Sequence, residues 1–434
     1  MSDSNAWRRL ARGVPAVLIL GAGALHRDRR ISARRNAPAA VHRLVNSATH
    51  LARFGVGLLL GLVPALLVVP ELARAQSGAA GPDSVAPAGA EVPHEAASRP
   101  QVPDWMNRLS FEGVSFLRYS YDVAGPTSDQ NEFDIDRVYF TLRARLWEKG
   151  TLRYTIEGTE LREDGTNQFD LATKYFYLQV DGVLGEGSYL RAGQLDLPWV
   201  PYEERVWGYR FQGKVLPDRA GYLTSTDLGV AAGGELPRGY GSWEAALVNG
   251  EGWKRGEAGK HKDVHARLTL NPLAGLGGAA ARFFVTGFAA LGTYDGLAAD
   301  VPTEKRRLIA QVGYKDRDRG TLAAEALWTR DPADALAARY PRLAERAGRV
   351  ADGRGFSVFG TLGLGRGWEA IARVDRWDPD EALDDEGYAL WIGGVAYRPV
   401  ERLRLLLNYE AVGWDDAAGR ADERRWMLQA EVRF

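Results

Sequence analysis

One long segment carries four basic side chains that could act on a negatively charged solute. Residues 196–225 include the run "LPWVPYEERVWGYRFQGKVLPDRAGYL", which is rich in arginine, tryptophan and tyrosine and contains three prolines. A guanidinium offers several N–H donors in one plane, and this geometry suits the oxygens of carboxylate and phosphate groups. A connection this long in a compact fold usually has a function. We therefore predict that Arg205, Arg210, Lys214 and Arg219 contact a solute.

A second set of basic residues lies in the run "RVYFTLRARLW" at residues 137–147. Apolar residues such as Val138 and Phe140 alternate there with polar ones, among them Arg143 and Arg145. A period of two predicts a β-strand with one apolar and one polar face. A soluble sandwich would bury the apolar face, whereas a membrane barrel would turn it toward lipid and leave the arginines in a wet lumen. This strand alone fits both architectures.

The predicted strands 150–161 and 187–195 contribute Arg153 and Arg191. If the long segment folds into a barrel lumen, Arg143, Arg145, Arg153 and Arg191 would face its basic residues, and rings of arginine in a pore favour anions. Nearby acids could neutralise these arginines and produce a mixed field without a strong preference. The arginines could also serve only to hold the segment in place. The opposing acids are Glu157, Glu203, Glu204, Asp218, Glu244 and Asp375.

Other kinds of chemistry find little support in the sequence. G-x-S-x-G and P-loop motifs are absent, and the chain has no cysteine for disulfides or thiolate metal sites. His261 and His265 are four residues apart, but in a strand this spacing does not bring two ligands to one metal as it would on a helix. We predict no enzyme activity, no metal and no cofactor. Residues 1–75 hold 11 of the 55 Lys and Arg and 3 of the 56 Asp and Glu, so the remainder has a net charge of −9, which does not support nucleic-acid binding.

About sixteen strands are predicted from Trp105 onward. Most are close to ten residues long, as a tilted membrane-spanning strand requires, whereas strands of soluble proteins average about five or six. The ranges are 111–121, 133–147, 150–161, 170–181, 187–195, 226–236, 241–249, 262–271, 280–292, 306–316, 320–330, 354–365, 367–376, 386–397, 401–411 and 424–434.

The connections between these strands alternate between short and long. Short ones include 148–149, 237–240, 317–319 and 398–400, and the long ones include 196–225 and 331–353. Outer-membrane barrels have tight periplasmic turns and longer outer loops. The alternation predicts an all-β fold, a transmembrane antiparallel β-barrel over residues 105–434. Two strands fit badly, because 170–181 places Lys174 on one face with Phe176 and Leu178, and 386–397 is apolar on both faces.

Three segments precede the predicted barrel. Residues 54–69 form an apolar run, and the small-x-small triplet "ARA" follows at 73–75, so residues 45–75 are predicted to be a secretory signal peptide. Residues 1–44 are rich in arginine, which suggests that translation begins further on, near Val45; the alternative is a genuine extended leader with a second apolar patch at Val14–Leu25. Residues 76–104 are rich in Ala and Pro and are predicted to be a disordered linker.

The last predicted strand ends on Phe434. This ending resembles the assembly signal of bacterial outer-membrane proteins, which implies recognition by the barrel-assembly machinery. The passage "RAGQLDLPWVPYEE" at Arg191–Glu204 resembles the G-Q-x-x-x-P passage of the phosphate-selective porin O/P family, and the likeness in layout covers residues 105–434. In porins with sixteen strands the third outer loop joins strands five and six and folds inward. Residues 196–225 have the same placement.

The resemblance implies a porin in the Gram-negative outer membrane, through which small hydrophilic solutes diffuse passively. It also implies an anion or phosphate preference, a homotrimer, and contact with outer-membrane lipid and lipopolysaccharide. A non-conducting outer-membrane barrel, either an adhesin or a structural protein, is the alternative class. An outer-membrane enzyme is a third.

Overall fold

The computed structural model describes residues 105–161, 168–254, 256, 259–383 and 386–434. The predicted leader (1–44), signal peptide (45–75) and linker (76–104) lie outside the described residues, so these three assignments stay predictions. The described part covers the predicted barrel region apart from short gaps.

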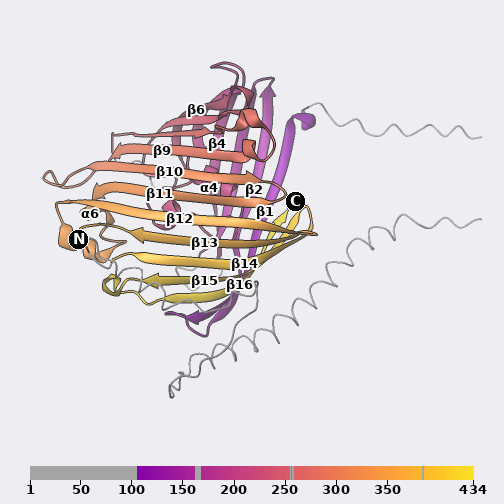
Figure 1. The fold of residues 1–434 in the computed structure, drawn as a ribbon. Helices are drawn as coiled ribbons and strands as arrows, with labels where there is room; N and C mark the ends of the chain where they lie inside the picture. Colours follow the sequence, from indigo (N-terminus) through magenta and orange to yellow (C-terminus); the bar gives the residue numbers. More distant parts are fainter. Residues whose placement is uncertain (1–104, 162–167, 255, 257–258, 384–385) are drawn as a thin grey trace, which may run out of the picture. The chain divides into compact units, whose positions relative to one another are not determined.

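Sixteen antiparallel strands form a closed barrel in the part of the chain that the structure describes (Figure 1). Each strand is hydrogen-bonded to its neighbours in sequence, and β1 pairs with β16, so the sheet has no free edge. The predicted fold class is confirmed. The strands are β1 Leu109–Ala124, β2 Asn131–Trp147, β3 Gly150–Leu161, β4 Gln168–Asp181, β5 Ser188–Asp196, β6 Thr226–Leu236, β7 Gly241–Val248, β8 Asp263–Leu270, β9 Phe283–Thr293, β10 Glu304–Asp316, β11 Gly320–Pro332, β12 Val350–Gly365, β13 Trp368–Asp378, β14 Tyr388–Val400, β15 Leu403–Trp414 and β16 Glu423–Arg433.

Helices are few and short, and among the described residues none is long and apolar enough to cross a membrane. In the described part of the chain three are α-helical and six are 3₁₀, all of three residues except η5, which has six. They are α4 Val200–Trp207, α5 Leu216–Arg219, α6 Ala333–Leu336, η1 Met106–Arg108, η2 Pro237–Gly239, η3 Ala274–Leu276, η4 Ala280–Arg282, η5 Pro341–Arg346 and η6 Asp416–Ala418.

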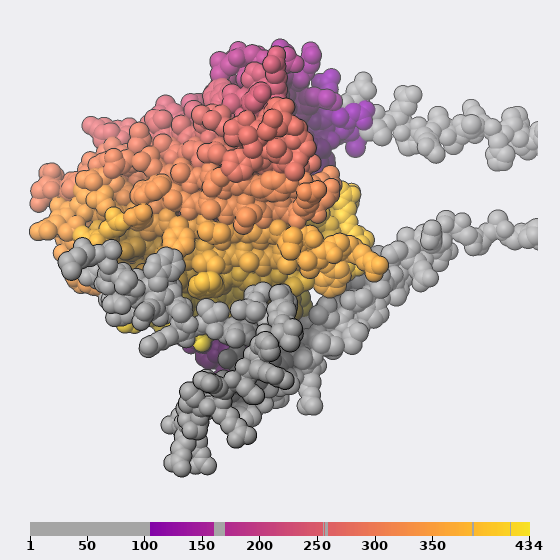
Figure 2. All heavy atoms as spheres, in the orientation of Figure 1, coloured from indigo at the N-terminus to yellow at the C-terminus, as the bar shows by residue number. Residues whose placement is uncertain are grey.

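The barrel is apolar outside and polar inside, which is the reverse of a soluble protein. In β8, Val264 and Leu268 are 49% and 46% exposed, whereas His265 and Arg267 are 5% and 6% exposed. Figure 2 shows the outside of the wall over β9 to β14 as one continuous surface. An apolar exterior around a polar lumen is the pattern of a transmembrane barrel. The predicted orientation of the strand faces is therefore confirmed for β8.

Short and long connections alternate around the barrel, and they define a short-turn end and a long-loop end. Turns at 148–149 and 366–367 lie at the first end, and the connection 197–225 lies at the other. One connection departs from this pattern, because residues 271–282 at the short-turn end include η3 and η4. The turn predicted at 398–400 lies at 401–402, because β14 continues to Val400.

The two strands that fitted badly have different explanations. In β4, Thr155 of β3 pairs with Tyr175 and Ile156 pairs with Thr173, so Lys174 is left over as a β-bulge. A bulge shifts the alternation of faces by one residue, so Lys174 faces the lumen together with Tyr175. The assignment of Lys174 to the same face as Phe176 and Leu178 was wrong, because it assumed that the side chains alternate between the two faces without a break.

Strand β14 is apolar on both faces because its inner face is covered. Leu390 and Ile392 point inward and belong to a buried apolar cluster that includes Trp207, a residue of the connection 197–225, while Trp391 faces outward and is half-exposed. Burying aliphatic side chains in this way contributes about 2 kcal/mol each.

Phe434 closes the seam between β1 and β16. Its backbone N–H donates to the carbonyl of Gly113 (3.0 Å), and its carbonyl accepts from the N–H of Gly113 (2.8 Å). The Phe434 ring packs edge-on against Phe140, with centroids 5.9 Å apart. It also lies directly over Gly113, where a larger residue would clash with the ring. The ring is on the apolar exterior. Its role as an assembly signal stays a prediction.

Candidate solute passage

Residues 197–225, called the inner loop below, connect β5 to β6 and fold into the lumen, so that α4 lies inside the barrel (Figure 1). Pro201 stands in the first turn of α4, where its missing N–H breaks no helical hydrogen bond. Gly208 ends the helix in the left-handed conformation, with φ of 77°. The predicted inward fold of the third long loop is confirmed.

Lumen side chains of the wall hold the inner loop by its backbone. Irregular backbone at this depth is tolerated where it is buried in protein or lines a wet cavity, and here arginine and glutamine side chains of the wall donate to its carbonyls. Among these bonds are Arg267 Nε to Pro198 O (2.9 Å), Arg307 Nε to Tyr222 O (3.2 Å), an Arg373 guanidinium nitrogen to Lys214 O (3.1 Å) and Gln429 Nε2 to Phe211 O (2.7 Å).

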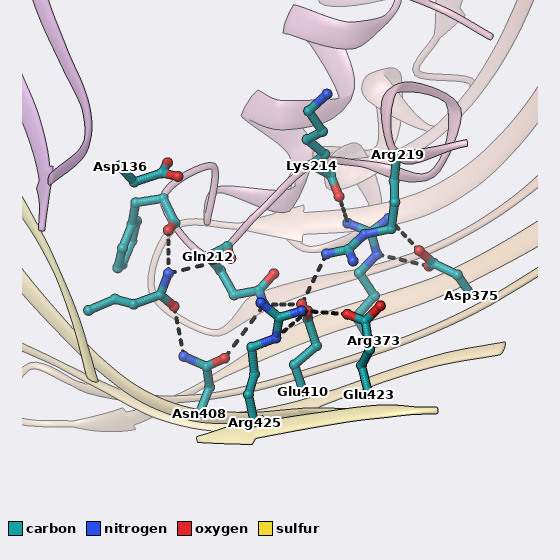
Figure 3. Close-up of polar contacts among 12 residues, drawn as sticks. Asp136, Gln212, Lys214, Arg219, Arg373, Asp375, Asn408, Glu410, Glu423 and Arg425 are labelled. Atoms are coloured by element: carbon teal, nitrogen blue, oxygen red, sulfur yellow. Dashed lines mark hydrogen bonds and ion pairs between the residues drawn. The ribbon is translucent and has the colours of Figure 1, made fainter. Parts of the chain in front are cut away.

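Figure 3 shows the corner of the loop that rests on β13 and β15. Arg373 is fully buried and pairs with the equally buried Asp375 (2.6 Å) while it donates to the backbone of Lys214. Arg219 reaches Glu410 of β15 (2.9 Å). Arg219 is thus used to anchor the loop.

The face of the inner loop that meets β8–β16 is aromatic. Trp199 packs on Phe288 with ring centroids 5.3 Å apart, and Trp207 packs on Phe359 at 5.4 Å. Both tryptophans are almost fully buried. Pairs of this kind add about 1 kcal/mol each beyond the burial of their area. The loop is therefore a packed part of the wall.

Two cavities lie beside the inner loop, lined by it together with β1–β5, β16 and residues 251–254 of the connection between β7 and β8. The turn-side cavity, which includes Arg143 and Arg433 in its lining, has a volume of about 450 Å³. The loop-side cavity, which includes Lys214 and Lys254, has a volume of about 190 Å³. Lys174, Arg210 and Ser225 line both of them. The two cavities therefore share part of their lining, and together they are called the passage below.

Charged side chains of both signs line this passage, and basic ones prevail by nine to six. The basic residues are Arg137, Arg143, Arg153, Lys174, Arg205, Arg210, Lys214, Lys254 and Arg433. The acidic residues are Glu112, Asp196, Glu204, Asp218, Glu251 and Glu431.

Most of these cations have a carboxylate partner. Arg210 pairs with Glu204 (2.5 Å), Lys214 with Asp218 (3.1 Å) and Arg143 with Glu112 (2.9 Å). Glu157 holds both Arg137 and Lys174. Arg153, Arg205 and Lys254 differ, because within the described ranges none of the three forms an ion pair with a carboxylate. Their charges are available to a solute.

Five of the eight predicted solute-binding residues line the passage. Arg205, Arg210 and Lys214 lie on the loop side, and Arg143 and Arg153 lie on the facing wall.

The other three predicted residues lie elsewhere. Arg219 anchors the loop to Glu410. Arg191 pairs with Asp196 (3.0 Å) and Glu244 (3.4 Å) and lines neither cavity. Arg145 is exposed near the short-turn end of β2, outside both cavities. The prediction that all eight act together on a solute is therefore too broad.

Sequence reasoning missed Lys174 and the tyrosines Tyr139 and Tyr175, which also line the turn-side cavity. Tyr139 lies on the same polar face of its strand as Arg143, so the period of two could have predicted that Tyr139 faces the lumen. Lys174 had no such signal, because its bulge breaks the period.

Two loop residues illustrate how burial changes ionisation. Burial opposes the charge of Arg210, but the carboxylate of Glu204 and the nearby Tyr139 outweigh it and raise the pKa of Arg210 above its ordinary value. Glu203 is fully buried and hydrogen-bonds Glu325 of β11. Its burial and the neighbouring acid raise the pKa of Glu203 well above its ordinary value. Glu203 therefore lies on the face of the inner loop that packs against β8–β16.

His261 and His265 do not lie beside each other in the structure. His261 Nδ1 lies 2.7 Å from Asp295 Oδ1 near the long-loop end, whereas His265 is buried in β8 against Phe288. Among the described residues no group of three His, Asp or Glu side chains could hold a metal ion.

Solved structures with a similar fold are outer-membrane proteins. The chain is similar to the outer membrane channel DcaP of Acinetobacter baumannii, with 13% identity and a TM-score of 0.54 over 75% of this chain and 97% of that chain. It is similar to the anion-selective porin from Comamonas acidovorans, with 11% identity and a TM-score of 0.54 over 75% of this chain and 99% of that one. It is also similar to the trimer form of in-vitro folded OmpT, an outer membrane protein of Vibrio cholerae, with 12% identity and a TM-score of 0.50 over 75% and 99%.

No protein-family model matches the chain, and no curated protein matches it in sequence. The likeness to the solved structures establishes a porin-type barrel fold. The resemblance to the phosphate-selective porin O/P family stays a prediction.

Proposed function

We propose that this chain is a porin of the Gram-negative outer membrane, through which small hydrophilic solutes diffuse passively. The observation that carries the proposal is the pair of neighbouring cavities beside the inner loop, inside a closed barrel with an apolar exterior. The porin-type fold of the solved neighbours supports both the location and the channel. No cofactor is needed, because diffusion requires only a wet path.

The passage is proposed to prefer anions. Basic residues outnumber acidic ones on its lining, and Arg153 and Arg205 keep their charges unpaired. An excess of positive charge along a pore raises the local concentration of anions. Phosphate fits the guanidinium fork well, so phosphate is one candidate solute. The many ion pairs along the lining favour a moderate preference over a strict one.

The assembly is proposed to follow that of other porins. One similar structure is a trimer form, which supports a homotrimer in outer-membrane lipid and lipopolysaccharide; the mass of the native protein in detergent tests it. Phe434 is proposed to be read by the barrel-assembly machinery, since its ring lies on the exterior. We expect the Phe434→Ser variant to be synthesised in normal amounts but to be less abundant in the outer membrane than the wild type.

A non-conducting barrel, such as an adhesin, is the alternative function, and an outer-membrane enzyme is a third. Reconstitution in planar bilayers separates the first two. We expect steady current steps that rise linearly with voltage, because the inner loop is packed against the wall and the proposed water-filled path beside it would then be fixed. Folded protein that inserts without any current would contradict the proposed channel.

A further inference from the structure

Alternating arginines and tyrosines line the wall of β3, β4 and β5 on the side that faces the inner loop. Arg153 Cζ lies 4.3 Å from the ring centroid of Tyr175 and 5.9 Å from that of Tyr177. Arg191 Cζ continues the series at 5.2 Å from Tyr177 and 4.1 Å from Tyr189. These five residues are called the Arg–Tyr stack below. All four distances fall within the range of cation–π contacts.

A guanidinium that stacks on a ring by its face keeps its N–H edge for an acceptor in its own plane. In the stack this edge is occupied for Arg191, which pairs with Asp196 and Glu244 and donates to Gln179. Arg153 has only longer bonds to neutral hydroxyls, at 3.3 Å to Thr155 and 3.4 Å to Tyr177. Arg153 is therefore the member of the stack that can take a carboxylate.

The turn-side cavity brings a second unpaired cation to the same space. Arg205 on α4 is exposed and lines the cavity from the loop side, while Arg153 and Tyr175 line it from the wall. Val114, Phe116 and Pro201 add apolar surface to the lining, which also carries the carboxylates of Glu112, Asp196, Glu204 and Glu431. A small inorganic ion keeps its water shell and gains nothing from apolar and ring surface. An organic anion with an apolar body gains from both.

We propose that the turn-side cavity is a binding site for organic carboxylates with a planar apolar body, with aromatic acids as the simplest members. The carboxylate binds the free edge of Arg153 and the guanidinium of Arg205, and the apolar body lies against Tyr175 and the apolar lining. A volume of about 450 Å³ accommodates such a molecule. The inference deepens the proposed function and rests on it, because the solute must reach an open cavity.

Single-channel recording with chloride as the charge carrier tests the site. Benzoate added to one side should reduce the current in a saturable manner. Acetate should need a concentration about tenfold higher, because it lacks the ring surface, and inorganic phosphate should also block less than benzoate. Arg153→Gln should raise the half-blocking concentration of benzoate about tenfold, as expected for the loss of one charge-assisted hydrogen bond. Arg145→Gln removes an exposed arginine outside the cavities and should leave the block unchanged.

Two further changes protect the test against misfolding of a single variant. Arg205→Gln alters an exposed side chain and should weaken the benzoate block as well. Tyr175→Leu should weaken it several-fold, whereas Tyr175→Phe keeps the ring and should preserve it.

Equal block by benzoate and acetate, or a stronger block by phosphate, would overturn this inference and leave the proposed channel intact. Unchanged block in Arg153→Gln and Arg205→Gln would also overturn it. A barrel that carries no current at all would overturn the proposed function and this inference together.

Discussion

At the scale of single residues, the partner of each arginine decides its role. Arg373 and Arg219 hold the inner loop, Arg210 is paired within the loop, and Arg153 and Arg205 are free for a solute. The sequence identified basic residues in the right segments, but it could not assign these roles. The partner of Arg373 in the loop, the carbonyl of Lys214, is 159 positions away along the chain. Such a contact leaves no mark in local spacing.

Glu203 provides a test at this scale through the pH dependence of stability. Because its pKa is raised in the folded state by burial and by Glu325, the folded protein holds this proton more tightly than the unfolded chain does. The stabilisation is fully present below the ordinary carboxyl pKa of about 4.3 and is lost as the pH rises through the raised value. We expect the urea midpoint of the wild type to fall over this range.

Glu203→Gln keeps a hydrogen-bonding group without the ionisation, so its urea midpoint should change less with pH. The control is Glu345→Gln, which alters an exposed ion pair with Arg342 and should keep the slope of the wild type. Parallel profiles for the wild type and Glu203→Gln would contradict this reading of the buried acid pair.

At the scale of elements, the inner loop and the bulge in β4 shape the passage. The loop covers the wall of β8–β16, and this explains why β14 is apolar on its inner face. The bulge turns Lys174 into the lumen, where Glu157 holds it at 2.9 Å and where it lines both cavities. A period of two predicted the strands but not the bulge, because one extra residue has no signature in composition.

Replacing Arg373, which anchors the inner loop to β13, should lower the stability of the folded protein. Arg373→Met would leave Asp375 buried without its cation, and breaking a buried ion pair in this way costs about 3–5 kcal/mol. We expect a clearly lower midpoint of urea unfolding in detergent. Arg354→Met removes a pair with Glu381 in which both side chains are more than half exposed, and it should cost less than about 1 kcal/mol. Equal losses in the two variants would show that Arg373 is not an anchor.

At the scale of the whole molecule, the fold was largely predictable. Strand period, strand length and the alternation of connections are local properties of a membrane barrel, and all three are visible in the sequence. The exception at 271–282 shows the limit, because turn length at the short-turn end is not fixed by the barrel. The charge balance of the passage depends on which side chains meet across the lumen. That balance therefore had to be obtained from the structure.

The zero-current potential in a steep KCl gradient tests the central claim most directly. Current steps of the wild-type protein are recorded in a planar bilayer, and the voltage at which the current vanishes is measured. Excess positive charge along the passage should admit chloride in preference to potassium, so the dilute side should become negative. Arg153→Gln with Arg205→Gln should move the potential toward zero. A positive dilute side in the wild type would contradict an anion-preferring passage.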